Sequence, residues 1–120
     1  MPVGHRNLVA WQRAMDLTVA VYDLNRPLRS LKHPELASQL VRAAVSVPSN
    51  IAEGRGRSSS REFAHFLDIS TGSLREVETL VELVSRLGLT RSGATADLLK
   101  QADEVGKVLF GLRRSVKAAR

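Results

Sequence analysis

An apolar repeat that alternates steps of four and three residues constrains this chain more than any other feature. It continues for about 28 residues and is followed near the C-terminus by a second repeat of the same spacing. The first comprises Phe63, Leu67, Ser70, Leu74, Val77, Val81 and Val84, and the second comprises Leu98, Ala102, Val105, Leu109, Leu112 and Val116. Such a period gives each segment one apolar helical stripe, which must be buried against other helices. Alternation with a period of two never exceeds four or five residues, so strands are not expected.

Two further helices are expected before these repeats. The first has Leu8, Trp11, Met15 and Tyr22 on one face, with Ala14, Leu17, Val21 and Leu24 beside them. Asn7 is expected to cap it and Pro27 to end it. The second starts at Pro34 and has its apolar seam at Leu36, Leu40, Ala43 and Val47.

Pro48 interrupts the second helix by removing the bond to the Ala44 carbonyl. The helix either stops near Ser46 or kinks and continues to Gly54. We favour the kink, because Ile51 prolongs the apolar face and Gly54 suits the position just after a helix.

The clearest loop is Gly54-Arg-Gly-Arg-Ser-Ser-Ser. Ser59 and Glu62 then have the spacing of a capping box, Gly88 is expected to end the third helix, and the fourth is expected to start near Thr95. Four amphipathic helices with short connections predict an all-α fold, an antiparallel up-down four-helix bundle with its second helix kinked at Pro48. Residues 1–120 form a single domain in this interpretation.

Catalysis finds little support in the sequence. The 120 residues include no cysteine, which excludes zinc fingers, iron–sulfur clusters and thiol chemistry. The histidines lack a nucleophile and an orienting acid at suitable spacing. Glu62-Phe-Ala-His65 has the spacing of a di-iron motif, but such sites need two of these motifs and two further glutamates. We therefore predict no enzyme activity, no catalytic residue, no cofactor and no metal.

The charge is concentrated along the chain. The 18 Lys and Arg exceed the 12 Asp and Glu, which gives a formal charge of +6. The basic residues that we expect to contact phosphates are Arg55, Arg57 and Arg61 in the loop, and Lys107, Arg113, Arg114, Lys117 and Arg120 near the C-terminus. Two other readings stay open: cations at the end of a helix complement its dipole, and arginine-rich composition can reflect codon usage. The five aromatic residues mostly fall on predicted core stripes, so we expect recognition of the backbone without sequence specificity rather than a protein that reads single strands by base stacking.

A polar stripe follows the second helix. Its members are Gln39, Arg42, Ser46, Asn50, Glu53 and Arg57, at steps of three or four residues. The stripe is either a solvated face or a polar network that is buried or faces another subunit. In the second case its partners would be Ser73 and Glu76 on the third helix, where Gly72 and Ser73 permit close helix approach.

Three stretches resemble the bacterial four-helix-bundle proteins encoded within intervening sequences of large-subunit ribosomal RNA genes. They are Leu8-Val-Ala-Trp-Gln-Arg-Ala-Met-Asp-Leu17, Gln39-Leu-Val-Arg-Ala-Ala-Val-Ser-Val-Pro-Ser-Asn-Ile-Ala-Glu-Gly54 and Phe66-Leu-Asp-Ile-Ser-Thr-Gly-Ser-Leu-Arg-Glu76. The same fold is shared with the accessory variability protein of diversity-generating retroelements. That protein is a basic pentamer that binds nucleic acid and a reverse transcriptase.

The resemblance implies a homopentamer, with RNA or DNA and a reverse transcriptase or another protein as partners, and no enzyme chemistry. It also implies that Arg42, Asn50, Glu53, Gly54 and Arg57 form a signature of bundle or subunit contact. The segment at 26–33 lacks the Phe-Pro and acidic residues of the family pattern. No secretory signal or long apolar run is apparent, so we expect a cytoplasmic protein without a membrane partner. The rival hypothesis is an interaction scaffold whose basic surface docks an acidic protein.

Overall fold

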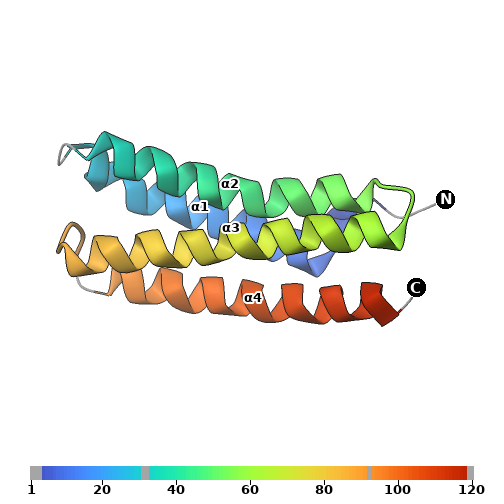
Figure 1. The fold of residues 1–120 in the computed structure, drawn as a ribbon. Coiled ribbons are helices and arrows are strands. Elements are labelled where there is room, and N and C mark those ends of the chain that lie inside the picture. Colours follow the sequence, from blue (N-terminus) through green and yellow to red (C-terminus); the bar gives the residue numbers. More distant parts are fainter. Residues whose placement is uncertain (1–3, 31–32, 92, 119–120) are drawn as a thin grey trace.

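The computed structural model describes residues 4–30, 33–91 and 93–118, except the side chains of 28–30, 117 and 118. A short 3-10 turn, η1 (His5–Asn7), precedes α1 (Val9–Ser30), α2 (Pro34–Arg55), α3 (Ser60–Arg86) and α4 (Ala94–Ala118). Successive helices run antiparallel, and the bundle is elongated, with extents of 47 × 20 × 19 Å (Figure 1). The predicted all-α, up-down four-helix bundle is confirmed, and the described ranges contain no strand.

The two heptad repeats form half of the core. All seven predicted positions of α3 are buried, and so are those of α4 except the half-buried Leu112. On α1, however, the buried group is Ala10, Ala14, Leu17, Val21 and Leu24. The face that includes Met15 and Tyr22 lies outside the core, since these side chains are 41% and 49% exposed. A helix with two adjoining apolar groups can bury only the one that its neighbours cover.

Both predicted boundaries of α1 are wrong. Asn7 lies in η1, and the amide of Gln12 donates to the carbonyl of Leu8, so the helix begins after Leu8 rather than after an Asn7 cap. Pro27 does not end α1, which continues to Ser30. Pro27 is exposed. The carbonyl that its missing amide would have bound is therefore near solvent, where water can replace the lost bond.

The helix α2 continues through Pro48 to Arg55, as expected. The structure shows what compensates for the missing amide. The hydroxyl of Thr18 on α1 approaches the Ala44 carbonyl at 3.2 Å, and it also lies 2.8 Å from the Ala14 carbonyl of its own helix. One turn away, the hydroxyl of Ser70 on α3 donates to the Val47 carbonyl at 2.9 Å. Side chains of both neighbouring helices thus solvate the backbone around the proline.

The connections are largely as predicted, with one correction. Gly54 is not the residue after α2; it lies inside the helix and is buried, and Gly56 occupies the C-cap. Ser59 caps α3 by accepting a hydrogen bond of 3.1 Å from the Glu62 amide, which confirms the predicted start of α3; the Glu62 carboxylate accepts from the Ser59 hydroxyl at 3.4 Å. Gly88, with a φ of 66°, ends α3 in the left-handed conformation that favours glycine.

Candidate nucleic-acid interface

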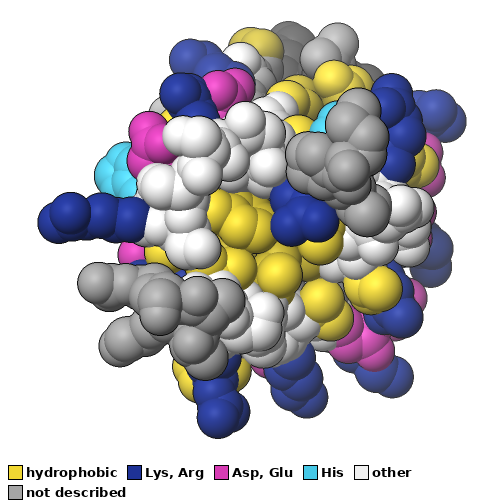
Figure 2. Space-filling model, turned by 90° about the vertical axis from the view of Figure 1, so that its right-hand side faces the viewer, with side chains coloured by type: hydrophobic (Ala, Val, Ile, Leu, Met, Phe, Trp, Pro, Cys, Tyr) yellow, Lys and Arg dark blue, Asp and Glu magenta, His cyan; other side chains and the backbone are white. Residues whose placement is uncertain are grey.

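The basic segments predicted from the sequence meet at one end of the bundle. Because α2 and α4 run in the same direction, the loop after α2 and the C-terminal part of α4 lie together, beside the start of α1 (Figure 1). We call this end, with its cations on residues 55–61 and on 113–118 of α4, the basic end; the predicted residue Lys107 lies instead near the middle of α4. Viewed along the bundle axis, it has hydrophobic side chains in its middle and Lys and Arg side chains around them (Figure 2).

The formal charge divides unequally between the two halves of the bundle. Contacts of Thr18 with Ala44, of Ser46 with Ser73 and of Gly106 with Leu74 mark one cross-section near the middle of the helices. Among the described residues on the side of the basic end, in 4–18, 46–72 and 106–118, nine are Lys or Arg and four are Asp or Glu, which is a charge of +5. The other described residues include seven Lys or Arg and eight Asp or Glu, which is a charge of −1. The positive excess of the described residues therefore belongs to one half.

Each loop arginine has a different environment. Arg57 forms an ion pair with Glu53 one turn earlier, and its guanidinium carbon lies 4.8 Å from the centre of the Phe66 ring. Arg55 lies 5.9 Å from the centre of the Phe63 ring. These contacts hold two arginines over aromatic rings at the start of α3. Arg61 is exposed and, in the part of the chain that the structure describes, forms no ion pair.

Arg113 on α4 is bound to an acid. Its Nε and a terminal nitrogen donate to the two carboxylate oxygens of Asp68 on α3, at 2.8 and 3.2 Å. The hydrogen bond from Arg113 lowers the pKa of Asp68 from its ordinary value, and the same bond raises the pKa of Arg113. This bidentate pair ties α4 to α3, so Arg113 is less available for an external phosphate than its position on α4 predicts.

The other basic residues of α4 differ in availability. Lys107 pairs with Asp103 at 3.3 Å, with both side chains largely exposed, and such pairs break readily. Arg114 is exposed and lies 5.9 Å from the centre of the Phe110 ring. The side chain of Lys117 and the whole of Arg120 lie outside the described residues.

The polar stripe of α2 contains a hydrogen-bond network with α3. The hydroxyls of Ser46 and Ser73 share a hydrogen bond of 2.7 Å, and the Asn50 amide donates to the hydroxyl and the carbonyl of Ser46 at 2.9 and 2.8 Å. Ser46, Asn50 and Ser73 are half-buried. The expected α2–α3 contact through Ser73 is thus present.

The rest of the stripe is more solvated. Gln39 and Arg42 are exposed, and Arg42 donates to the Ser38 hydroxyl at 3.3 Å. Glu76 is exposed as well. Gly72 does not serve close helix approach, because a Cβ added there would meet nothing within 4 Å. The glycine that does allow close approach is Gly54, packed against Phe63 and Phe66.

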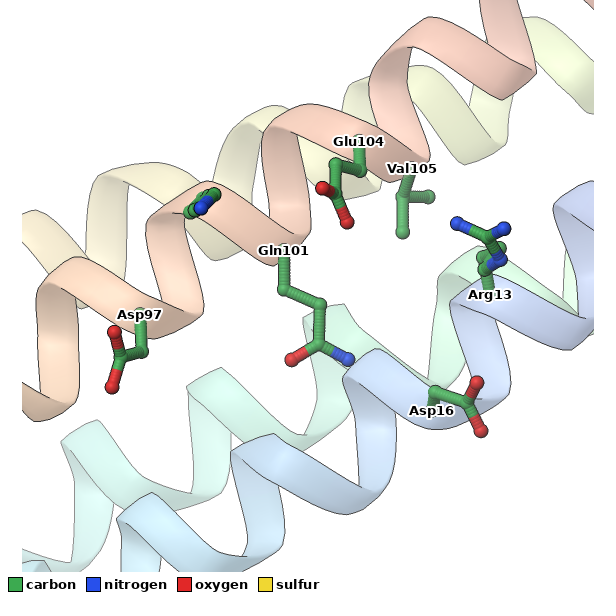
Figure 3. A pocket seen from close by; sticks show the side chains of 7 residues that line it. Arg13, Asp16, Asp97, Gln101, Glu104 and Val105 are labelled. Carbon is green, nitrogen blue, oxygen red and sulfur yellow. The ribbon is translucent and has the colours of Figure 1, made fainter.

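A groove between α1 and α4 is lined by charged residues rather than by a catalytic cluster. It encloses about 420 Å³. Asp97, Gln101 and Glu104 project into it from α4, and Arg13 and Asp16 come from α1 (Figure 3). A second groove of about 630 Å³ lies toward the opposite end, between α1 and the connection from α3 to α4. Among the described residues, no group of three or more ligating side chains could hold a metal ion, and no helix is long and apolar enough to cross a membrane.

Two residues beside the arginines of α4 have environments that the sequence did not predict. Asp68 was not expected to pair with Arg113, because 45 positions separate them. Phe110 was placed with the mostly core-facing aromatics, yet it is 66% exposed. A helical wheel of α4 could have predicted the exposure of Phe110, because this residue falls outside the apolar stripe that runs from Leu98 to Val116.

The fold and the basic end define a small up-down four-helix bundle with the positive excess of its described residues in one half. The family model of the 23S rRNA-intervening sequence protein matches residues 6–111, and the chain belongs to that family. A crystal structure of a protein of unknown function from the S23 ribosomal protein family of Bacteroides thetaiotaomicron has the same fold. Its TM-score is 0.79 at 20% identity, over 88% of this chain and 98% of that one. No curated protein matches the chain.

Proposed function

We propose that this protein is a non-enzymatic, oligomeric nucleic-acid-binding protein that contacts the phosphate backbone of RNA or DNA through its basic end. The observation that carries the proposal is the location of the positive excess of the described residues in the half of the bundle that contains the loop after α2 and the C-terminal part of α4. A polyanion gains most from such a surface, because each neutralised phosphate releases condensed counterions.

The cations of this end divide into two groups by availability. Arg61 and Arg114 are exposed and, among the described residues, have no carboxylate partner, so they can bind phosphate without breaking an ion pair. Arg57 and Arg113 already share their guanidinium groups with Glu53 and Asp68. We expect Arg61 and Arg114 to supply most of the affinity, and Arg57 and Arg113 to orient the basic end on the nucleic acid.

Filter binding in low salt tests the proposal with two triple charge reversals. Replacement of Arg113, Arg114 and Lys117 by Glu should abolish retention of RNA and DNA. Replacement of Arg86, Arg91 and Lys100 by Glu changes the net charge by the same amount in the other half of the bundle and should retain most of the binding. Arg113→Glu also removes the ion-pair partner of Asp68. The single variants Arg61→Glu and Arg114→Glu therefore serve as a check, because neither breaks an ion pair among the described residues. Wild-type protein that retains neither RNA nor DNA would refute the proposal.

The family suggests the biological setting. The name of the family links its members to intervening sequences of 23S rRNA, so we propose an accessory role in such an element or in a retroelement. Assembly as a homopentamer belongs to the same proposal. Light scattering should then give five times 13.1 kDa, or 65.5 kDa, and a monomer mass would contradict it.

An alternative partner is an acidic protein docked on the same surface. Phe110 favours it, because an exposed aromatic ring beside an arginine is typical of protein interfaces. A pull-down in which the partner stays bound after nuclease treatment would support this alternative, and loss of the partner would support nucleic acid as the bridge.

A further inference from the structure

The basic end has an apolar centre, and this feature points to a specific form of nucleic acid. We propose that the basic end seats the blunt end of a double-stranded nucleic acid, with its terminal base pair stacked on that centre and its terminal phosphates on the surrounding cations. The inference rests on the proposed function, because it names the form of nucleic acid that the same surface binds.

The apolar centre arises because the four helices end at different levels. From the cross-section near Thr18, Ser46, Ser73 and Gly106, α3 and α4 extend about three residues further than α1 and α2, or roughly 4.5 Å. Inward-facing side chains on these extensions are covered less completely than those near the cross-section. Leu112 is half-buried, whereas Phe63 and Val116 are 8% and 7% exposed. Leu8, at the start of α1, is also half-buried.

The surrounding cations come from separate elements. Arg55 ends α2, Arg57 lies in the loop and Arg61 lies in the first turn of α3, while Arg113 and Arg114 belong to α4. In Figure 2 the Lys and Arg side chains stand around the hydrophobic middle rather than within it, apart from one near the centre. The three acids nearest in sequence to these cations are Glu53, Glu62 and Asp68. Two of them pair with arginines, and Glu62 caps α3.

The end of a duplex has the complementary arrangement. Its terminal base pair offers a flat apolar face, and the phosphates of both strands lie around that face. The bundle is 20 × 19 Å across, which is close to the width of a duplex. The side of a duplex fits less well, because it presents phosphates and polar groove edges to the apolar centre. A single strand lacks the paired phosphates that would meet cations on opposite sides.

The experiment compares three DNA probes of one sequence by fluorescence anisotropy. They are a blunt duplex of about 16 base pairs, the same duplex closed at both ends by loops, and one of its strands. The blunt duplex should bind at least about tenfold more tightly than the closed one, because burial of even part of the face of the terminal base pair against apolar side chains supplies an effect of that order. If about four phosphates are contacted, a plot of the logarithm of the binding constant against the logarithm of the salt concentration should have a slope of about −3.6.

A pair of variants separates stacking from charge. Leu112→Asp places a carboxylate in the apolar centre and should remove the preference for the blunt duplex. Leu99→Asp is the matched control, because Leu99 is also half-buried on α4 but lies in the other half of the bundle. Circular dichroism checks that both variants remain folded, and Val116→Ser provides a milder version if Leu112→Asp does not fold.

The outcomes distinguish the two proposals. Equal affinity for the blunt and the closed duplex would overturn end seating and leave phosphate binding in place, and so would a preference for the single strand. Binding to none of the probes in low salt, together with no retention of RNA, would instead refute the proposed function.

Discussion

Gly54 is the position where a single methyl group should disturb the packing of α2 on α3. A Cβ at this position would lie 2.7 Å from the Cβ of Phe66, 3.0 Å from Cδ1 of Phe63 and 3.3 Å from the Phe63 carbonyl oxygen. The Cβ of Phe66 cannot move without its backbone. The Gly54→Ala substitution therefore requires α2 and α3 to separate locally.

Two opposing effects set the size of the change. Overpacking of this kind costs about 1–3 kcal/mol. Alanine is favoured over glycine in a helix by about 1 kcal/mol, but Gly54 lies one residue before the end of α2, where the gain is smaller. We expect Gly54→Ala to lower the free energy of unfolding by about 1–2 kcal/mol.

Gly72→Ala is the matched control for this substitution. Gly72 lies inside α3, is exposed, and would bring its Cβ within 4 Å of nothing. It should raise the free energy of unfolding by about 0.8–1 kcal/mol. The two variants are compared by urea unfolding, followed by circular dichroism at one protein concentration, because oligomers unfold in a concentration-dependent way. If Gly54→Ala stabilises the protein as Gly72→Ala does, the close approach of α2 and α3 at Gly54 is wrong.

The same unfolding assay tests three other contacts. Thr18→Val removes the hydroxyl that donates to the Ala44 carbonyl and should lower the free energy of unfolding by about 1–2 kcal/mol. Thr71→Val should lower it less, because the Thr71 hydroxyl bonds only within its own helix, and equal losses would contradict the role of Thr18. Ser59→Ala should cost about 1 kcal/mol through the lost cap of α3, and an unchanged stability would mean that the cap contributes nothing. A double-mutant cycle with Asp68→Asn and Arg113→Gln should give about 0.2–1 kcal/mol at neutral pH, because both side chains are partly exposed. The pKa of Asp68 is lowered in the folded state, so this coupling is fully present above its ordinary value of 3.8 and is lost as the pH falls through the lowered pKa. A coupling that persists once Asp68 is protonated would contradict the assignment.

The parts of the fold that follow local patterns were predictable from the sequence. Heptad spacing identified the buried positions of α3 and α4, and the capping box and Gly88 marked the ends of α3. The errors in α1 have a different origin. Both of its apolar groups satisfy helical periodicity, and only the packing of α2 and α4 decides which is buried. Pro27 permits the helix to continue because its surroundings are exposed, a condition that the sequence around it does not record.

Contacts between distant residues account for the rest of what the sequence did not reveal. The Ala44 carbonyl accepts a hydrogen bond from the Thr18 hydroxyl, 26 positions away in the sequence. The continuation of α2 through Pro48 was therefore predictable, but the hydrogen bond that replaces the missing proline amide was not. For the candidate site, the sequence located the basic segments and the up-down topology then puts them at one end. Which arginines pair with a carboxylate could not be predicted, because the pairing of Arg113 with Asp68 depends on how α3 and α4 are aligned along the bundle axis.

The helix dipole does not explain the charge distribution. It accounts for cations at the C-terminal ends of α2 and α4, which both lie at the basic end. The opposite end also has two helix C-termini, those of α1 and α3, yet the described residues of its half include eight acids and seven bases. Arg61, moreover, lies in the first turn of α3, where the dipole disfavours a cation. Since both ends have the same set of helix termini, the difference of six charges between them needs another cause, and an anionic partner at the basic end supplies one.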